Sequence, residues 1–401
     1  MIDSLFLYIR KFSEKIQKHK FLLFAVLYIP LTLVYWSRYD FNPTSMLNFG
    51  KEFAVQNREL MPERAVVQKG EEGDLGAGYD GQIFYFYSRS INQQSGWPKG
   101  FDDSYRAPRI GYPLLGAVFG VLGKQGTLFG MYFFNLVLFF ISCMLLVKML
   151  QPKNAWLAVF YLLSPFSLGS YMVLVSDSVM VSLVIIAYWF FLNNKYLYFS
   201  LLAGLAILTK EPALFFLFPL GLKTLADRDY KKSLVVLSAL VYPFFWQLYL
   251  KINFPNWSPV RLMDFILPLE GIAVYLHGLI HSFAANSWKE VAREFSRFPL
   301  FLLFLTGVYA MLDGNLKKGY VFRITLFFGF FMIGTAGHYH FWSVYENISR
   351  MFTITVPAAI LLANEELTTS LKTYFLLTLG ILGLYLLKIL LITRAHAFEI
   401  F

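Results

Sequence analysis

Acidic side chains interrupt the apolar stretches of this 401-residue sequence at a few places, and the first is Asp80, in GYDGQIFYFY. Glycines close to both sides of this carboxylate let the backbone adopt positive φ and let a ligand approach closely. A carboxylate held in this way can act as a general base or as a metal ligand. The alternative is that Asp80 caps a surface helix beginning at Gly81 or Gln82.

Two further carboxylates stand at the edges of apolar segments. Asp177, in VLVSDSVMVS, has a serine on each side, and Glu211, in LTKEPALFF, precedes Pro212. Both patterns suit the first turn of a helix, because serine caps helices, proline fits the first position and acids favour the positive end of the helix dipole. The functional interpretation is that both acids orient a substrate or an ion. The sequence leaves both interpretations open.

Basic residues accompany these acids. DDSYRAPRIGYP places Arg106 and Arg109 beside tyrosines, Lys210 lies within TKEP, and Arg350 follows Glu346 in HYHFWSVYENISR. Because guanidinium groups form bidentate hydrogen bonds to phosphate, the arginines suggest a phosphate site. The alternatives are snorkelling to lipid headgroups for the first two arginines and an ion pair with Glu346 for Arg350.

Two histidines in the same stretch, His338 and His340, could bind a metal as a pair. The sequence offers no third ligand at a suitable spacing, so no metal site is predicted there. A single cysteine, Cys143, excludes both an intrachain disulfide and a cysteine-based metal site.

The composition indicates an integral membrane protein. Hydrophobic residues make up 57% of the chain and charged residues 15%, against about 25% charged in an average soluble domain. The net charge of +10 does not indicate nucleic acid, because lysine and arginine gather in the cytoplasmic loops of membrane proteins and meet anionic membrane lipids there.

The basic flank before the first apolar run predicts a cytoplasmic N-terminus over residues 1–20 and a retained first helix over 21–36. A first outer loop then covers 37–127. The short run 110–123 is not expected to cross, because a crossing there would move the later basic loops to the outer face. The second span is then 128–150.

About eleven spans are expected in one all-α membrane domain covering 1–401. Because several of these spans are shorter than the bilayer core, some helices are expected to be tilted or interrupted. A second long outer loop, 253–297, should carry two helices lying on the membrane surface, at 274–283 and 288–295. The remaining spans are expected at 155–174, 178–194, 197–209, 212–225, 233–252, 298–312, 320–337, 351–363 and 372–392.

This arrangement and its motifs resemble the GT-C superfamily of glycosyltransferases, multi-span enzymes that take a sugar from a polyprenyl-phosphate carrier on the outer face. GYDGQIFYFYS, YRAPRIGYPLLG and LAGLAILTKEPALFF are similar to stretches of a group of bacterial cell-surface-glycopolymer proteins. The resemblance covers roughly residues 20–250 well and the C-terminal third loosely. The paired D-x-D or E-x-D of some GT-C families is missing, which puts dependence on Mg²⁺ or Mn²⁺ in doubt.

Membership of this superfamily would imply that Asp80 is the acid of the first outer loop, Asp177 that of the second, and Glu211 the next. Asp80 would take the proton of an acceptor hydroxyl or bind a divalent cation, and the transfer would invert the anomeric carbon. The phosphate-binding candidates are Arg106, Arg109, Lys210 and Arg350. Tyr79, Gln82, Asp177 and Glu211 would position the sugar, and His338, His340 and Glu346 are further candidates.

The resemblance further implies a polyprenyl-phosphate-linked sugar donor, a glycan, lipid or protein acceptor, and a bacterial plasma membrane with the site on its outer face. The rival class is a transporter or flippase of lipid-linked or small substrates. Transporters usually show inverted repeats and ionisable groups near the middle of the bilayer. Here no repeat is visible, and the candidate charges are expected on one side.

Overall fold

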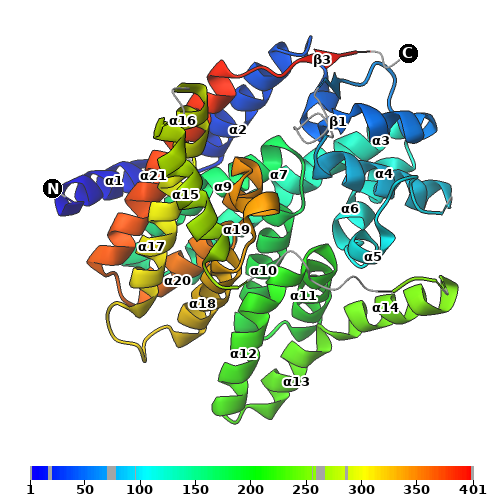
Figure 1. The fold of residues 1–401 in the computed structure, drawn as a ribbon. Coiled ribbons are helices and arrows are strands. Elements are labelled where there is room, and N and C mark those ends of the chain that lie inside the picture. The colour runs from blue at the N-terminus through cyan, green and yellow to red at the C-terminus, as the bar shows by residue number, and fades with distance from the viewer. Residues whose placement is uncertain are drawn as a thin grey trace.

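The computed structural model describes residues 2–16, 20–69, 78–94, 96–254, 256–258, 267–284 and 288–398, and it is built almost entirely of helices (Figure 1). The helices of the first half are α1 (Ile2–Ile16), α2 (Lys20–Ser37), η2 (Pro43–Leu47), α3 (Lys51–Gln56), η3 (Arg58–Leu60), α4 (Asp80–Gln93), α5 (Asp103–Arg106), α6 (Gly111–Gly120), α7 (Lys124–Met149), η5 (Pro152–Ala158), α8 (Val159–Leu162), α9 (Pro165–Met172), α10 (Asp177–Leu192) and α11 (Tyr196–Thr209).

The second half continues the same architecture. Its helices are η6 (Glu211–Ala213), α12 (Leu214–Ala226), α13 (Tyr230–Ser238), α14 (Val241–Asn253), α15 (Glu270–Ala284), α16 (Trp288–Phe295), α17 (Phe298–Leu312), α18 (Tyr320–Gly334), the π-helical turn η7 (His338–Trp342), α19 (Tyr345–Met351), α20 (Thr355–Glu365) and α21 (Thr369–Leu391).

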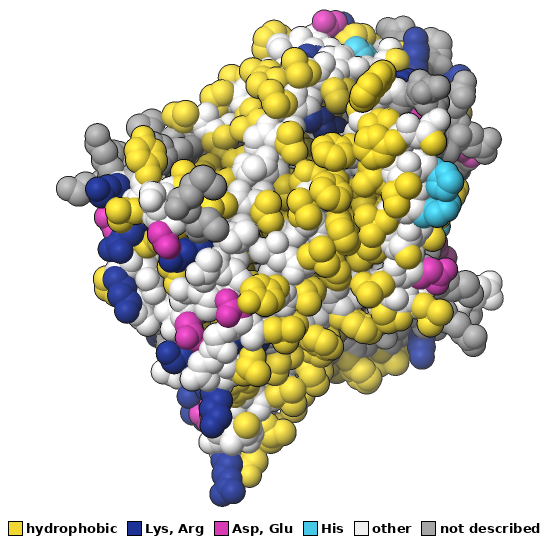
Figure 2. Space-filling view, turned by 60° about the vertical axis from the view of Figure 1, so that its left-hand side comes forward, with side chains coloured by type: hydrophobic (Ala, Val, Ile, Leu, Met, Phe, Trp, Pro, Cys, Tyr) yellow, Lys and Arg dark blue, Asp and Glu magenta, His cyan; other side chains and the backbone are white. Residues whose placement is uncertain are grey.

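The helices confirm a polytopic membrane protein. Within the described ranges, five helical segments are long and apolar enough to cross a membrane: Lys124–Met149, Pro152–Met172, Tyr230–Asn253, Trp288–Leu312 and Thr369–Leu391. Shorter apolar helices, such as α10 and α11, add to them. Figure 2 shows a broad hydrophobic area across the middle of one side of the molecule, with charged side chains gathered toward its margins. The total of about eleven spans stays a prediction.

The helix α10 lies at the centre of the fold. Its residues Asp177 to Ala187 are all buried, and it packs against α7, α9 and α11. Apart from its first two residues and one serine, those buried residues are all aliphatic. A helix apolar on every side is expected in the interior of a membrane bundle, where each of its faces meets another helix.

The segment 110–123 forms a short helix, α6, rather than a full span. Ten residues rise about 15 Å, half of the ~30 Å hydrocarbon layer. The helix α6 turns directly into α7 and packs against it and against α4. Glycines permit this packing: a Cβ on Gly126 would lie 2.2 Å from the carbonyl oxygen of Phe119.

Two expected spans are interrupted: 155–174, and 233–252, which the structure divides into α13 and α14. The sequence predicts a continuous helix over 155–174, but the structure has a break between α8 and α9. Pro165 occupies the first turn of α9, and the hydroxyl of Ser164 accepts a hydrogen bond from the Ser167 amide at 3.4 Å. Proline cannot continue a helix without removing a backbone hydrogen bond, so the chain restarts there.

The structure also contains a small sheet, which the all-α prediction missed. Among the described residues three two-residue strands pair in the order β1 (Phe49–Gly50), β2 (Val67–Gln68) and β3 (His396–Ala397). The strand β1 is parallel to β2, and β3 is antiparallel to β2. The sheet therefore joins the first outer loop to the segment that follows α21. Helices are present at the two positions predicted within 253–297, as α15 and α16, and α16 forms part of the candidate span Trp288–Leu312. Their place on the membrane surface stays a prediction, and 259–266 lie outside the described residues.

We expect the α6–α7 contact to be sensitive to a single methyl group. Gly126→Ala should lower the free energy of unfolding by about 1–3 kcal/mol, because the new Cβ meets backbone that cannot move freely. Gly380→Ala, in α21, is the matched control, since a Cβ there meets nothing within 4 Å. The measurement is thermal unfolding of the purified protein in detergent. Equal midpoints for the two variants would contradict this packing.

Candidate functional site

Asp80 is the first residue of α4, and the turn before it is tightly constrained. Gly78 has φ of +82°, and the amide of Tyr79 donates to the carbonyl oxygen of Asn48 at 3.0 Å. A Cβ on Gly81 would lie 2.4 Å from the carbonyl oxygen of Val173. Gly78 therefore permits the left-handed backbone, and Gly81 permits the close contact with the neighbouring backbone. Together they fix the position from which the carboxylate projects.

The side chain of Asp80 binds two arginines. Its Oδ1 accepts from Arg106 Nη1 at 3.1 Å, and its Oδ2 accepts from Arg350 Nη1 at 3.0 Å. Tyr79, not Asp80, occupies the N-cap position of α4, so the capping interpretation is wrong, although Asp80 does lie in the first turn. Burial disfavours the charged form, but the guanidinium groups of Arg350 and Arg106 outweigh it and hold the pKa of Asp80 well below its ordinary range. The carboxylate is therefore ionised at neutral pH.

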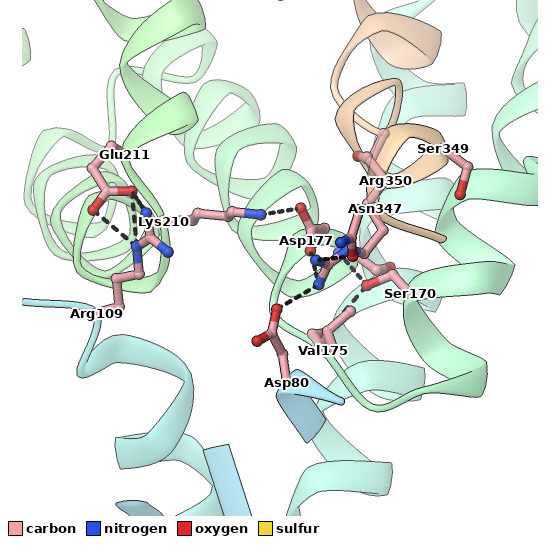
Figure 3. A network of polar contacts seen from close by, with 12 residues as sticks. Asp80, Arg109, Ser170, Val175, Asp177, Lys210, Glu211, Asn347, Ser349 and Arg350 are labelled. Atoms are coloured by element: carbon pink, nitrogen blue, oxygen red, sulfur yellow. Dashed lines mark hydrogen bonds and ion pairs between the residues drawn. The ribbon is translucent and has the colours of Figure 1, made fainter. Parts of the chain in front are cut away.

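Asp177 opens α10 from a strained turn. Leu174, three residues earlier, has φ of +46°, an uncommon conformation for a branched side chain. Ser170 holds the turn, since its hydroxyl donates to the carbonyl oxygen of Val175 at 3.2 Å and accepts from the amide of Ser178 at 2.9 Å (Figure 3). Strained backbone of this kind persists where surrounding contacts fix it, and it is common at functional sites.

The carboxylate of Asp177 does not cap its helix either; it pairs with Lys210. Only 5% of the side chain is exposed, and Lys210 Nζ lies 2.5 Å from Oδ1. Lys210 directly follows α11, so the pair joins the adjacent ends of α10 and α11 (Figure 3). The other oxygen, Oδ2, has no hydrogen-bond partner within the described part of the chain. That oxygen can accept a further donor.

Arg350, on α19, lies between the two aspartates. Its Nη1 is 3.0 Å from Asp80 and 3.7 Å from Asp177, and its Nη2 donates to Asn347 Oδ1 at 3.1 Å. The guanidinium carbon sits 4.7 Å from the ring centre of Tyr79. The Nε of Arg350 is buried and, among the described residues, finds no hydrogen-bond partner. One arginine thus links α4, α10 and α19.

A second ion pair, between Arg109 and Glu211, lies on the other side of Lys210 (Figure 3). Arg109 Nε donates to both carboxylate oxygens at 3.0 Å, and Nη2 is 3.0 Å from Oε2. The guanidinium also stacks 3.9 Å from the ring centre of Tyr105. Pro212 stands in the first turn of η6, as the sequence predicts. Half of the Glu211 side chain is exposed, so this pair can open more readily than the buried Lys210 pair.

The other predicted site residues fall into two groups. Tyr79 belongs to the cluster, because its hydroxyl donates to Asn347 Oδ1 at 2.7 Å. Gln82 is buried, and its Oε1 accepts from the Gly50 amide at 2.9 Å, which ties α4 to β1. Glu346 pairs with Lys388 and Arg394, so its predicted pair with Arg350 is wrong.

The two histidines lie in η7. Within the described ranges they belong to no group of three or more His, Cys, Asp or Glu residues close enough to hold an ion. Partial burial lowers the pKa of His338, with a smaller contribution from Arg297. At Asp80, both oxygens already accept hydrogen bonds from arginines. The donor set therefore does not fit a divalent cation, and we derive no step through one.

Sequence inspection missed Asn347, which links Tyr79 to Arg350. Asn347 lies three residues before Arg350, and residues at this spacing share one face of a helix, so the sequence did indicate that the two could be neighbours. Sequence inspection also missed Tyr105 as a stacking partner of Arg109.

The fold and the site together define a multi-pass helical membrane protein whose ionisable residues gather where several helices end. No protein-family model matches the chain, and no curated protein matches it.

Among solved structures, the chain is similar to ArnT from Cupriavidus metallidurans, in the apo state and bound to undecaprenyl phosphate. The identities are 15% and 14%, and the TM-score is 0.47 in both cases. The similarity covers 85% of this chain but 58% and 59% of the ArnT chains, so this chain spans less than two thirds of their length. At this level the similarity assigns neither a residue role nor a substrate to the chain.

Breaking the buried pair at the head of α10 should destabilise the protein. Lys210→Met leaves Asp177 buried without its closest partner, and we expect a loss on the order of 3 kcal/mol in the free energy of unfolding. The double variant with Asp177→Asn should recover part of this loss, as a double-mutant cycle would report.

The control for this cycle is Lys223→Met, which removes an exposed pair with Asp227 and should cost less than about 1 kcal/mol. Urea or thermal unfolding in detergent measures the wild type, the two single variants, the double variant and the control. A Lys210→Met loss no larger than that of the control would contradict a structural ion pair at Asp177.

Proposed function

We propose that this protein is a membrane glycosyltransferase of the GT-C type, which moves a sugar from a polyprenyl-phosphate carrier to an acceptor hydroxyl at the outer face of the membrane. The observation that carries the proposal is the contact of Arg350 with both Asp80 and Asp177. It places a candidate base, a second acid and a phosphate-binding group within one cluster.

Charge supports a phosphate ligand. Among the described residues of the cluster, four cations (Arg106, Arg109, Lys210 and Arg350) face three carboxylates (Asp80, Asp177 and Glu211). The excess positive charge suits a leaving phosphate, on which negative charge develops in the transition state. Arg350 Nε, buried and without a partner among the described residues, is a donor available to such an anion.

The chemistry needs a proton acceptor near the anomeric carbon. The acceptor oxygen would form a bond to that carbon, the bond from carbon to phosphate oxygen would break, and the hydroxyl proton would pass to Asp80. The low pKa of Asp80 makes it a weak base while both arginines hold it. If Arg106 and Arg350 turn toward a bound phosphate, Asp80 loses their stabilisation and becomes more basic as the donor arrives.

The remaining groups would orient the sugar. Asp177 Oδ2, which lacks a hydrogen-bond partner among the described residues, can accept from a sugar hydroxyl. Glu211 is half exposed and can do the same if its arginine moves. Tyr79 and Gln82 are both committed to protein contacts, so we expect them to support the turn that carries Asp80.

The location follows from the charge pattern. Basic loops indicate the cytoplasmic side, which supports an outer-face position for the cluster. The bacterial plasma membrane is what the resemblance to cell-surface-glycopolymer proteins implies. The carrier tail would lie among the apolar helices, and the acceptor is a glycan, a lipid or a protein. The alternative is a transporter or flippase of lipid-linked or small substrates; transporters usually carry internal repeats, and none is visible in the sequence.

The first test removes the base. Asp80→Asn should lower kcat by about 10²–10⁴-fold, because the amide cannot take the proton. The assay mixes purified protein with radiolabelled polyprenyl-phosphate sugars and follows release of the lipid phosphate. Glu59→Gln, an exposed acid of the same outer loop, is the control and should keep wild-type activity. Unchanged transfer by Asp80→Asn would refute the assignment.

The second test uses pH. A depressed pKa keeps Asp80 ionised as the pH falls, so kcat/KM of the wild type should show no acid limb from this group between pH 5 and 8. Arg350→Gln removes one stabilising cation while burial remains, which raises the pKa, so the acid limb should move to higher pH. Arg106→Gln should shift it in the same direction. Identical profiles for wild type and both variants would argue against Asp80 as the titrating group.

A further inference from the structure

Arg394 lies outside the candidate cluster, in the segment between α21 and β3. Its side chain bonds Asn48, which contacts the turn before Asp80, and Glu346, which lies on the helix of Arg350. Its Nη1 donates to Asn48 Oδ1 at 3.0 Å, and its Nη2 donates to Glu346 Oε1 at 3.2 Å. This segment crosses to the part of the fold that carries β1 and β2 (Figure 1). About three quarters of the Arg394 side chain is buried. The two bonded partners come from sequence positions almost 300 residues apart.

The first branch runs through Asn48 to the turn that precedes α4. Asn48 is fully buried and has φ of +52°, a conformation that asparagine tolerates better than most residues. Its carbonyl oxygen accepts the amide of Tyr79 at 3.0 Å. Because Tyr79 directly precedes Asp80, the orientation of Asn48 sets where α4 begins.

The second branch runs through Glu346 to α19. Glu346 lies one turn before Arg350 on the same helix, and it also pairs with Lys388 of α21. Burial disfavours its charged form, but Lys388 and Arg394 outweigh this and lower its pKa to about 2. Between Glu346 and Arg350, Asn347 accepts from the hydroxyl of Tyr79 at 2.7 Å. The position of α19 therefore depends on the cations that hold Glu346.

We propose that Arg394 is a positioning residue of the transfer reaction. It closes a ring of contacts that runs from Asn48 through Asp80, Arg350 and Glu346. The ring fixes the distance between the proposed base, Asp80, and the phosphate-binding Arg350. The role in sugar transfer rests on the proposed function, whereas the ring of contacts does not. A guanidinium is required, because its planar fork reaches two acceptors at once, whereas lysine presents a single charge.

The segment is held in place independently of the ring, which provides a matched control. Arg38 donates to the carbonyl oxygens of Ile392 and Leu390, and the amide of Lys69 donates to the carbonyl oxygen of Ala395 at 2.8 Å. Among the described residues, the hydrogen bonds of the Arg38 side chain reach neither Asn48 nor Glu346. Arg38→Ala thus loosens the same segment without opening the ring.

The first measurement needs no substrate: hydrogen exchange, read by mass spectrometry, on the peptide that contains the Tyr79 amide. Arg394→Ala should raise exchange there about tenfold, Arg394→Lys by less, and Arg38→Ala not at all. Asn48→Gly keeps the left-handed backbone but removes the amide side chain, so it should act like Arg394→Ala even if the latter folds poorly. Unchanged exchange in Asn48→Gly and Arg394→Ala would overturn the ring.

The second measurement is transfer kinetics on the same proteins. Misplacing reacting groups by about 1 Å can cost about 10²-fold, so Arg394→Ala should lower kcat about 10- to 100-fold, with partial rescue by Arg394→Lys and wild-type rates for Arg38→Ala. Faster exchange with unchanged kcat would overturn the positioning role. A wild-type protein that transfers no sugar would instead refute the proposed function, and the exchange result would still decide whether the ring exists.

Discussion

The placement of Arg350 between Asp80 and Asp177 is the interaction on which the rest of the site depends. Taking a charge out of water costs several kcal/mol unless a partner compensates it, and here three largely buried charges compensate one another. Each belongs to a different helix. The first turns of α4 and α10 and the last turn of α19 must therefore approach closely enough to bring the arginine within 3.0 Å of one carboxylate and 3.7 Å of the other, which constrains how the helices pack.

The breaks between helices follow from this constraint. The turn with Leu174 at positive φ brings Asp177 to the start of α10, and α11 ends at Thr209 so that Lys210 can reach it. Backbone groups at helix ends need partners, and the site lies where such ends converge.

Much of the fold was predictable from composition and apolar runs, because crossing a hydrocarbon layer demands long apolar helices. The helices α15 and α16 and the short α6 were predicted as well, whereas their positions relative to the membrane stay predictions. The break before Pro165 and the three short strands were not. Strand pairing between segments more than 300 residues apart leaves little trace in local pattern, and a single proline within an apolar run is compatible with either a kink or a stop.

The sequence by itself determined that this is a membrane protein and which few ionisable residues stand beside its apolar segments, because the cost of placing charge in hydrocarbon makes such residues conspicuous. Only the tertiary structure decided their partners. It pairs Arg350 with Asp80 and Asp177 rather than with Glu346, and it brings Arg394 to Asn48 and Glu346. Ion pairs depend on distances of about 3–4 Å between side chains, and for residues far apart in the chain helix packing alone sets these distances.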